Sequence, residues 1–221
     1  MLNLYGDEKM VFAPGHGADI ASQRADDLDN MALEYITQGC HALDLASGAG
    51  GQAIRMAKRG AIVTAIDIAD MGAQISAASM RDGTASTVSF IQADMRNIDS
   101  IEFPSLFRVI VCQRAVHYLK IQEAALTLQS LRKYISNQSK IFLSASGINS
   151  ELGDGYGGCG IPLEKRYATL STEMADKHGI QGNVCLYDEQ DMRNLALNSG
   201  FNLEQVFLSG FGNVKAILKM A

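Results

Sequence analysis

The stretch His41-Ala-Leu-Asp-Leu-Ala-Ser-Gly-Ala-Gly-Gly51 passes from an apolar run into a cluster of small residues. A short apolar run that ends at glycines is typical of a buried strand, and Gly48, Gly50 and Gly51 allow a tight turn that approaches a ligand closely. Asp44 stands inside the apolar part, where a carboxylate needs a partner. The stretch therefore predicts a strand, a ligand-binding turn and a helix, with one acidic side chain beside the turn.

The segments around this unit alternate between strand and helix patterns. Strands are predicted at Ala42–Ala46, Ile62–Ile66, Val88–Gln92, Phe107–Cys112, Lys140–Ala145, Leu203–Leu208 and Val214–Met220. Helices are predicted at Asp19–Ile36, Gln52–Lys58, Met71–Met80, Ile121–Ile135 and Asp188–Asn198. This alternation indicates an α/β fold with a mostly parallel sheet covered by helices on both faces. The last two strands, joined by a short Gly-containing turn, predict an antiparallel β-hairpin.

Composition favours one globular domain over residues 1–221, with 47% hydrophobic and 19% charged residues. The net charge of -5 and the scattered Lys and Arg residues argue against nucleic acid as substrate. No apolar run is long enough to cross a bilayer, and the N-terminus lacks the pattern of a signal peptide, so we expect a cytoplasmic protein without membrane contact. The four cysteines have no zinc-type spacing, and we expect no metal.

The turn Gly48-Ala-Gly-Gly-Gln-Ala53 also fits GxGxxA, the pyrophosphate fingerprint of dinucleotide enzymes, with Asp67 at about the distance expected for a ribose-binding residue. Asp44 argues against that interpretation, because a carboxylate close to the turn would repel phosphates. A cofactor with a cationic end would instead be attracted. An NAD(P)-dependent oxidoreductase therefore remains the alternative rather than the preferred class.

Leu43-Asp-Leu-Ala-Ser-Gly-Ala-Gly50 resembles the first motif of the class I S-adenosylmethionine-dependent methyltransferases, with Ala46 in place of the first glycine. The resemblance continues through the strand ends "TAIDIA", "FIQADMRNI" and "VIVCQRAVHYL". It implies a Rossmann-like, doubly wound, seven-stranded sheet and methyl transfer from S-adenosylmethionine to a small-molecule acceptor, with S-adenosylhomocysteine as product. A module that binds the cofactor without catalysis is a further alternative.

The resemblance also implies which residues bind the cofactor. Asp67 would hold the ribose hydroxyls, Ile68 would lie beside the adenine, and Asp94 with Met95 would meet its polar edge. Gln113 follows the strand end whose backbone faces the methionine ammonium. The implied cofactor set is Asp44, Ala46, Gly48, Gly50, Asp67, Ile68, Asp94, Met95 and Gln113. Each carboxylate has a second interpretation: Asp44 as an acceptor of backbone N–H bonds from the turn, and Asp67 and Asp94 as helix N-caps.

His117 and Tyr118 follow the fourth strand and are the candidates for a general base, although side chains there also pack under the next helix. Arg114 is a candidate for binding an acidic acceptor, or a solvated residue at a helix start.

Residues 1–38 are predicted to form an N-terminal helical cap, in which Met10 and Phe12 belong either to ordinary packing or to a flap over the cofactor. The segment 147–187 is glycine-rich at its front, and Leu163, Tyr167, Leu170 and Met174 then follow at helical spacing before Gly179. It is predicted to be a lid that supplies Tyr156, Arg166 or Tyr167 to the acceptor, or else a helix that packs on the sheet edge or in a dimer. The oligomeric state does not follow from the sequence.

Overall fold

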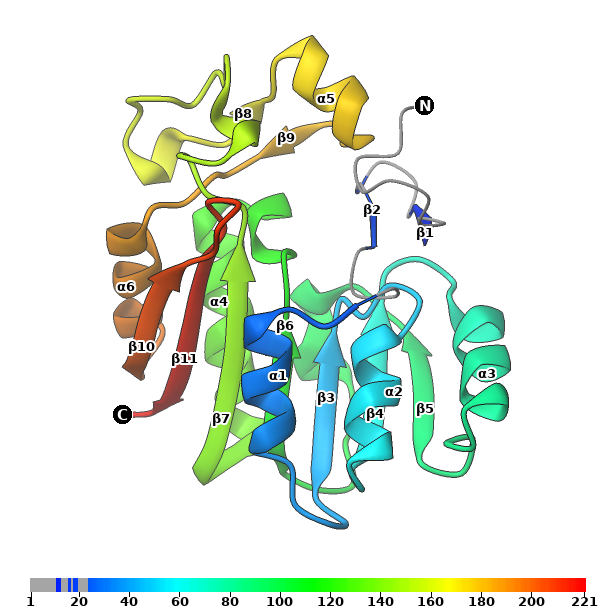
Figure 1. Cartoon of the computed structure of the whole chain (residues 1–221). Coiled ribbons are helices and arrows are strands. Elements are labelled where there is room, and N and C mark those ends of the chain that lie inside the picture. Colours follow the sequence, from blue (N-terminus) through cyan, green and yellow to red (C-terminus); the bar gives the residue numbers. More distant parts are fainter. Residues whose placement is uncertain (1–10, 13–15, 17, 20–23) are drawn as a thin grey trace.

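The computed structural model describes residues 11, 12, 16, 18, 19 and 24–221, and it consists of one seven-stranded sheet between helices, with a smaller layer above it (Figure 1). The strands of the large sheet are β3 (His41–Leu45), β4 (Ile62–Asp67), β5 (Val88–Gln92), β6 (Phe107–Cys112), β7 (Ile135–Ala145), β10 (Phe201–Leu208) and β11 (Val214–Met220). The short strands are β1 (Val11–Phe12), β2 (Ala18–Asp19), β8 (Ala168–Thr169) and β9 (Asn183–Val184).

The helices follow the same alternation. They are α1 (Asp27–Glu34), α2 (Gly51–Lys58), α3 (Gly72–Arg81), α4 (Ile121–Leu131), α5 (Thr172–His178) and α6 (Glu189–Asn198). Short 3-10 helices lie at η2 (Met95–Ser100), η3 (Val116–Tyr118), η4 (Arg132–Tyr134), η5 (Glu151–Gly153) and η6 (Leu163–Lys165).

The strand order is β10-β11-β7-β6-β3-β4-β5. β3, β4, β5, β6 and β7 are parallel, whereas β11 runs antiparallel to both β7 and β10. This confirms the predicted doubly wound sheet with a C-terminal hairpin. Because the parallel strands point the same way, the ends of β3, β4, β5 and β6 meet at one edge, where ligands of such sheets bind.

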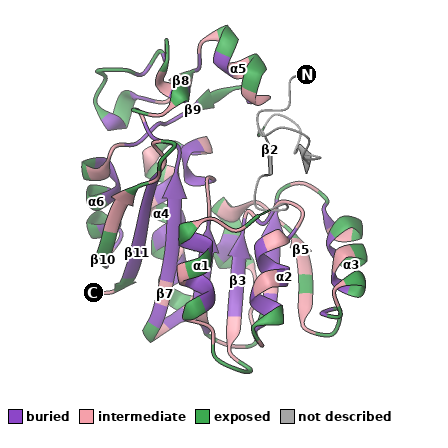
Figure 2. Ribbon diagram, in the orientation of Figure 1, coloured by how far each residue is buried: buried purple, intermediate pink, exposed green. Residues whose placement is uncertain are grey.

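Two apolar cores cover the two faces of the sheet. One joins α1, α2 and α3 to the sheet, and the other joins α4 and α6 to its opposite face, as the ribbon in Figure 1 also shows. Figure 2 shows the central strands buried and the outer helix faces exposed. Central strands such as β3 therefore consist of nearly continuous apolar residues, with Asp44 as the exception.

Some predicted boundaries were wrong. The first helix begins at Asp27 rather than Asp19, because the Asp26 carboxylate accepts the N–H groups of Leu28 (2.8 Å) and Asp29 (3.1 Å) and caps the helix there. The helix expected to reach Ile135 ends at Leu131, and Ile135 begins β7, where it is 6% exposed. The apolar side chain of Ile135 fits both the helical spacing of the residues before it and the pattern of a buried strand.

The described part of residues 1–38 holds α1 and the small β1–β2 pair, while Met10 lies outside the described residues. Within the described part of the chain, no helix is long and apolar enough to cross a membrane.

Segment 147–187 forms the layer above the sheet edge. The predicted continuous helix is wrong: α5 covers only Thr172–His178, after the turn at η6 and the strand β8. Gly179 ends α5 with a φ of 67°, as predicted. Leu152, Tyr156, Leu170 and Met174 share a small core of this segment with Leu186.

Candidate functional site

A cavity of about 780 Å³ lies between the carboxyl edge of the sheet and segment 147–187. Its floor comes from the ends of β3, β4, β5 and β6, and its roof includes residues 149–152, Tyr167, His178 and Ile180. The cavity brings together most of the predicted site residues: Asp44, Ala46, Gly48, Asp67, Ile68, Asp94, Met95, Gln113, Arg114, His117, Tyr118 and Tyr167. Gly50, Tyr156 and Arg166 are not among its lining residues.

Asp44 links the end of β3 to the start of α2. It is 4% exposed, and its Oδ2 accepts the N–H of Ala53 at 2.8 Å. Three residues of the intervening turn have left-handed backbones: Ala46 (φ 59°), Gly48 (φ 52°) and Gly50 (φ 79°). Ala46 thus adopts a conformation that glycine adopts without strain, at the position where it replaces the motif's glycine.

Asp67, at the end of β4, binds the same turn from the neighbouring strand. Its Oδ2 accepts the N–H of Gly48 at 2.8 Å, and its Oδ1 accepts the N–H of Ala69 at 2.9 Å. Because a carboxylate can accept about four hydrogen bonds, both oxygens keep room for a ligand hydroxyl. Ile68 beside it is 49% exposed at the cavity.

Asp94 is held by Arg96. The guanidinium of Arg96 donates from Nε to Oδ2 at 2.9 Å, and its backbone N–H donates to Oδ1 at 2.9 Å, so Asp94 is also the N-cap of η2. The hydrogen bonds from the Arg96 side chain, followed by the backbone hydrogen bond and the charge of Arg96, outweigh partial burial and lower the pKa of Asp94. The carboxylate is therefore ionised at neutral pH.

Gln113 and Arg114 follow β6 and belong to a buried polar chain. Lys215, 3% exposed, pairs with Asp26 at 2.8 Å, and Gln113 donates to the other oxygen of Asp26 at 3.1 Å. Gln113 in turn accepts from the hydroxyl of Ser144 at 2.9 Å, and that hydroxyl accepts the N–H of Arg114 at 2.9 Å. These hydrogen bonds fix the backbone after β6, where Gln113 and Arg114 line the cavity.

His117 is 1% exposed and faces Ser146. The N–H of Ser146 lies 3.4 Å from Nδ1, and its hydroxyl lies 3.4 Å from Nε2. Burial, aided by the charges of Arg114 and His16, lowers the pKa of His117 to about 3. The imidazole is therefore neutral at physiological pH, with both nitrogens directed at Ser146.

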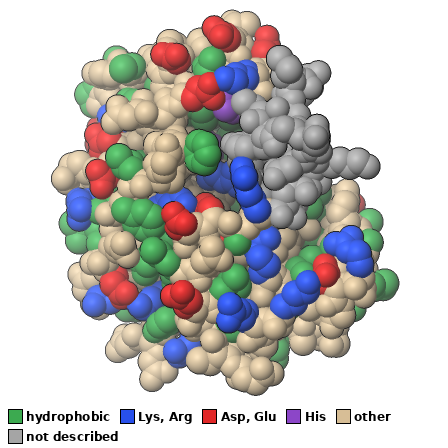
Figure 3. Space-filling view, in the orientation of Figure 1, with side chains coloured by type: hydrophobic (Ala, Val, Ile, Leu, Met, Phe, Trp, Pro, Cys, Tyr) green, Lys and Arg blue, Asp and Glu red, His purple; other side chains and the backbone are tan. Residues whose placement is uncertain are grey.

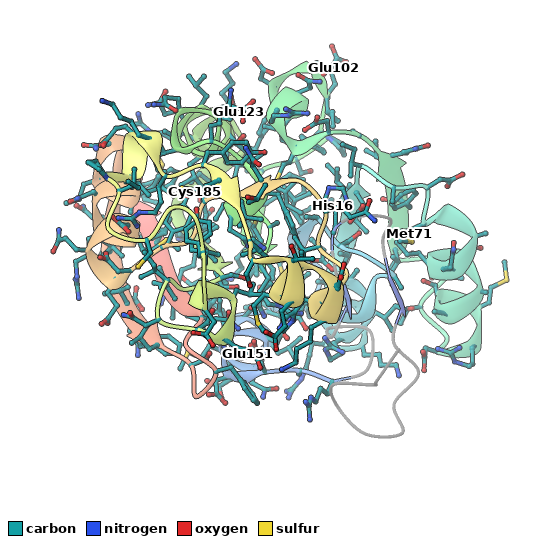
Figure 4. The ribbon with its side chains drawn as sticks, turned by 90° about the horizontal axis from the view of Figure 1, so that it is seen from above. His16, Met71, Glu102, Glu123, Glu151 and Cys185 are labelled. Carbon is teal, nitrogen blue, oxygen red and sulfur yellow. The ribbon has the colours of Figure 1, made fainter. Side chains whose placement is uncertain are left out.

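Tyr118 donates its hydroxyl to the carbonyl of His16, and the two rings meet edge to face with centroids 5.0 Å apart. Burial raises the pKa of the Tyr118 phenol, so it stays protonated. His16 also bridges to Ile180 of the roof. In Figure 4, which looks down on this edge, His16 lies beside the segment that carries α5, and Glu151 belongs to that segment.

Tyr156 and Arg166 lie inside the roof instead of facing the cavity. The Tyr156 hydroxyl, in a side chain 3% exposed, contacts the carbonyls of Arg166 and Val184, and Arg166 forms an ion pair with Asp191 of α6. Both are therefore structural residues of the roof, and the prediction that they contact the acceptor does not fit their placement. Tyr167 does line the cavity, and its hydroxyl donates to the carbonyl of Tyr118 at 3.3 Å.

Several cavity residues were not predicted. His16, Asp29, Ser146 and His178 line the cavity but were not among the predicted site residues. The position of Ser146 directly after the β7 strand was a usable signal. For His16 and His178 the sequence offers no such signal, because their placement depends on contacts between residues that are distant in the chain. Among the described residues, no group of three or more His, Cys, Asp or Glu side chains is arranged to hold a metal ion.

Comparison with known proteins agrees with this geometry. Residues 42–138 match a family described as "Methyltransferase domain". A stretch of 78 residues is 35% identical to the YqeM protein of Bacillus subtilis (strain 168), a match that covers 35% of this chain and only 30% of that protein.

Solved structures with the same fold include the PH0226 protein of Pyrococcus horikoshii OT3, with 18% identity, 88% of each chain covered and a TM-score of 0.68. The 1,6-didemethyltoxoflavin-N1-methyltransferase of Burkholderia thailandensis has 12% identity and a TM-score of 0.67, over 91% of this chain and 79% of that one. Magnesium protoporphyrin IX methyltransferase of Synechocystis PCC 6803 has 15% identity and a TM-score of 0.61, over 88% and 80%.

The strand order and the glycine turn with its acidic partners define a Rossmann-like methyltransferase fold. Residues 42–138 match the methyltransferase domain, and together with the fold this match supports the class I S-adenosylmethionine-dependent methyltransferase family.

Proposed function

We propose that this methyltransferase transfers the methyl group of S-adenosylmethionine to a small-molecule acceptor bound under segment 147–187. The observation that supports this most directly is that Asp44, Asp67 and Asp94, from three different strand ends, line one cavity beside the glycine turn. Each carboxylate is already positioned by a backbone N–H. Asp94 is an N-cap, as its alternative interpretation predicted, whereas Asp67 is not, because α3 begins at Gly72. These structural roles leave acceptor capacity for a ligand.

The residues present fit the cofactor. Asp44 provides negative charge for a cationic methionine end, Asp67 provides acceptors for ribose hydroxyls, and Asp94 provides an acceptor for the adenine amino group. Ile68 and Met95 provide apolar contact for the ring, while Ala46, Gly48, Gly50 and Gln113 shape the turn and the end of β6. When bound, S-adenosylmethionine supplies a methyl group activated by the positive charge on sulfur.

Catalysis is proposed to depend on alignment and on the exclusion of water, which together supply most of the rate of an in-line displacement. His117 and Tyr118 are proposed to shape the acceptor side and not to act as general bases. The neutral imidazole of His117 is directed at Ser146, and the Tyr118 hydroxyl donates a hydrogen bond to the backbone carbonyl of His16. The acceptor atom therefore has to be nucleophilic without a base from these two residues.

A small acceptor is favoured by the roof. Residues 149–152, His178 and Ile180 cover the cavity, and about 780 Å³ lies within the range of small-molecule sites. The net charge of -5 gives no support to nucleic acid binding, and Figure 3 shows acidic as well as basic side chains on one face of the described residues. Two of the similar structures are named for small-molecule acceptors. Segment 147–187 is proposed to act as the lid of a single domain over residues 1–221.

The alternative of an NAD(P)-dependent oxidoreductase is disfavoured because Asp44 lies at the cavity beside the turn where a pyrophosphate would bind. A cofactor-binding module without catalysis has the same binding site, so only turnover separates it from the enzyme.

Thermal unfolding and calorimetry test these classes. We expect S-adenosylhomocysteine to bind and raise the melting temperature, and NAD(P) to do neither. A screen of small molecules with S-adenosylmethionine, followed by detection of S-adenosylhomocysteine, then identifies the acceptor. Binding of NAD(P) in place of S-adenosylhomocysteine would refute the proposal, and cofactor binding without turnover of any small molecule would favour the non-catalytic module.

A further inference from the structure

Arg114 is a half-buried cation at the cavity without a carboxylate partner among the described residues. Its Nε is buried and has no hydrogen-bond partner. The other arginines near the site differ in this respect: Arg96 pairs with Asp94 and Glu123, and Arg166 pairs with Asp191. A buried donor without a partner is unfavourable, and a bound anion would satisfy it.

The backbone of Arg114 is held in an unusual conformation. Its φ is 49°, in the left-handed region that residues with a Cβ seldom adopt. The N–H that fixes this conformation donates both to the carbonyl of Ser144 (3.0 Å) and to its hydroxyl (2.9 Å), and Ser144 is fully buried. Through Gln113 and Asp26 the same polar chain extends to the buried Lys215. The backbone of Arg114 is therefore fixed by hydrogen bonds to buried partners.

Charge is unevenly distributed in the cavity. The acidic side chains Asp29, Asp44, Asp67 and Asp94 come from α1 and the ends of β3, β4 and β5, whereas Arg114 follows β6, near Tyr118 and Ser146. Glu151 of the roof is already engaged by Lys177 and His178. The carboxylate-lined part suits a cationic cofactor, and the part around Arg114 suits an anion.

We propose that Arg114 binds a carboxylate group of the methyl acceptor, so that the substrates of this enzyme are small organic acids. A guanidinium presents two parallel N–H donors that match a carboxylate, which gives both affinity and orientation. This inference rests on the proposed function, because it assigns the acceptor side of the same cavity. It makes Arg114 a specificity-determining residue.

The test uses the full chain saturated with S-adenosylhomocysteine, whose binding is measured first by calorimetry. Benzoate and benzamide are then titrated as probes, since they share shape and differ in charge. The NMR signal of the Arg114 Nε–H, assigned by its absence in Arg114→Lys, reports the contact directly. We expect benzoate to shift this signal in a saturable manner, and benzamide at the same concentration to leave it unchanged.

Arg114→Gln is the matching variant, and Arg108→Gln, at the opposite end of β6, is its control. We expect Arg114→Gln to weaken benzoate binding at least tenfold and to change S-adenosylhomocysteine affinity less than twofold, while Arg108→Gln changes neither. Absence of a benzoate shift, or equal shifts from benzamide, would show that the inference is wrong. A parallel loss of S-adenosylhomocysteine binding in Arg114→Gln would assign Arg114 to the cofactor instead. Failure of the wild type to bind S-adenosylhomocysteine would refute the proposed function itself.

Discussion

The backbone N–H of Gly48 donates to Oδ2 of Asp67 at 2.8 Å, so the glycine turn after β3 is anchored by the carboxylate that ends β4. The other oxygen of Asp67 holds the N–H of Ala69. One side chain thus fixes two of the loops at the floor of the cavity, those after β3 and β4. Its removal is expected to affect both the shape of the turn and ligand binding.

Asp67→Ala is expected to weaken S-adenosylhomocysteine binding about tenfold to hundredfold, equivalent to about 1.5–3 kcal/mol for hydrogen bonds that involve a charged group. Calorimetry measures the change. Asp70→Ala is the control, because this nearby carboxylate is exposed and is not among the residues that line the cavity. Unchanged affinity in Asp67→Ala would contradict the assignment of Asp67 to the cofactor.

Ala46→Gly is expected to stabilise the protein by up to about 1 kcal/mol, because a left-handed alanine is strained and the strain outweighs the extra entropy of glycine in the unfolded chain. Ala53→Gly, within α2, should instead destabilise by about 0.5–1 kcal/mol or more. Urea denaturation measures both free energies of unfolding. A loss of stability in Ala46→Gly would show that the methyl group contributes packing that outweighs the strain.

The sequence predicted the sheet well and also predicted that the acidic residues at its strand ends meet, because both depend on local patterns. Apolar runs located the strands, and the parallel order then brought Asp44, Asp67 and Asp94 to one edge without any knowledge of packing. The predicted helix start at Asp19 failed because the capping hydrogen bonds to Asp26 determine it, and periodicity does not report them.

Segment 147–187 could be predicted only in part. Helical spacing in residues 163–174 suggested one helix, but Leu163 lies in η6, Tyr167 and Leu170 flank β8, and Met174 lies in α5. Leu170 and Met174 pack into the small core of the segment, whereas Leu163 joins the main core. Tyr156 and Arg166 have the chemistry of ligand-binding residues, yet they satisfy backbone carbonyls and Asp191 inside the roof. Their roles depend on contacts between distant residues, which the sequence does not specify.

The buried neutral His117 predicts an acid-sensitive fold. Burial is the main cause that lowers the pKa of His117 from about 6.5 to about 3. Between these two pH values the unfolded chain binds a proton at His117 and the folded chain does not. This contribution to stability is present above pH 6.5 and is lost as the pH falls towards 3, with a slope of up to about 1.4 kcal/mol per pH unit. His117→Gln should remove this slope in urea denaturation between pH 7.5 and 5.

Val116→Ala is the control for that experiment, because Val116 is adjacent to His117 in the chain and is also buried, but its side chain is apolar and does not bind a proton. It should lower stability equally at each pH. A wild-type pH slope in His117→Gln would contradict the prediction, whereas a lower stability at neutral pH would not, since the hydrogen bonds with Ser146 are lost.

The ion pair of Lys215 and Asp26 predicts unequal costs for its two partners. Lys215 is 3% exposed, whereas the Asp26 side chain is 39% exposed and can be hydrated. Asp26→Asn should therefore destabilise by about 3–5 kcal/mol, because it leaves a buried charge unpaired, and Lys215→Met should cost clearly less. In the double variant the methionine should recover most of the loss caused by Asp26→Asn. If urea denaturation gave equal losses of stability for the two single variants, hydration of Asp26 would not compensate for the loss of Lys215.

Tyr167 and Tyr156 provide a matched pair for the role of the roof, because both come from segment 147–187 and only Tyr167 lines the cavity. Tyr167→Ala removes a half-buried ring and its hydrogen bond to the Tyr118 carbonyl. With the acceptor found by the turnover screen, kcat/KM should fall at least tenfold while S-adenosylhomocysteine affinity changes less than about twofold, equivalent to a loss of about 1.4 kcal/mol or more on the acceptor side alone.

Tyr156→Phe should show the opposite pattern. The buried hydroxyl contacts the carbonyls of Arg166 and Val184 and accepts the N–H of Leu186, so its loss should lower the free energy of unfolding by about 1–3 kcal/mol. The kcat/KM of the folded protein should stay near that of the wild type, because the residue does not reach the cavity. Wild-type turnover in Tyr167→Ala, or a selective loss of turnover in Tyr156→Phe with unchanged stability, would show that the acceptor does not bind against the Tyr167 side of the roof.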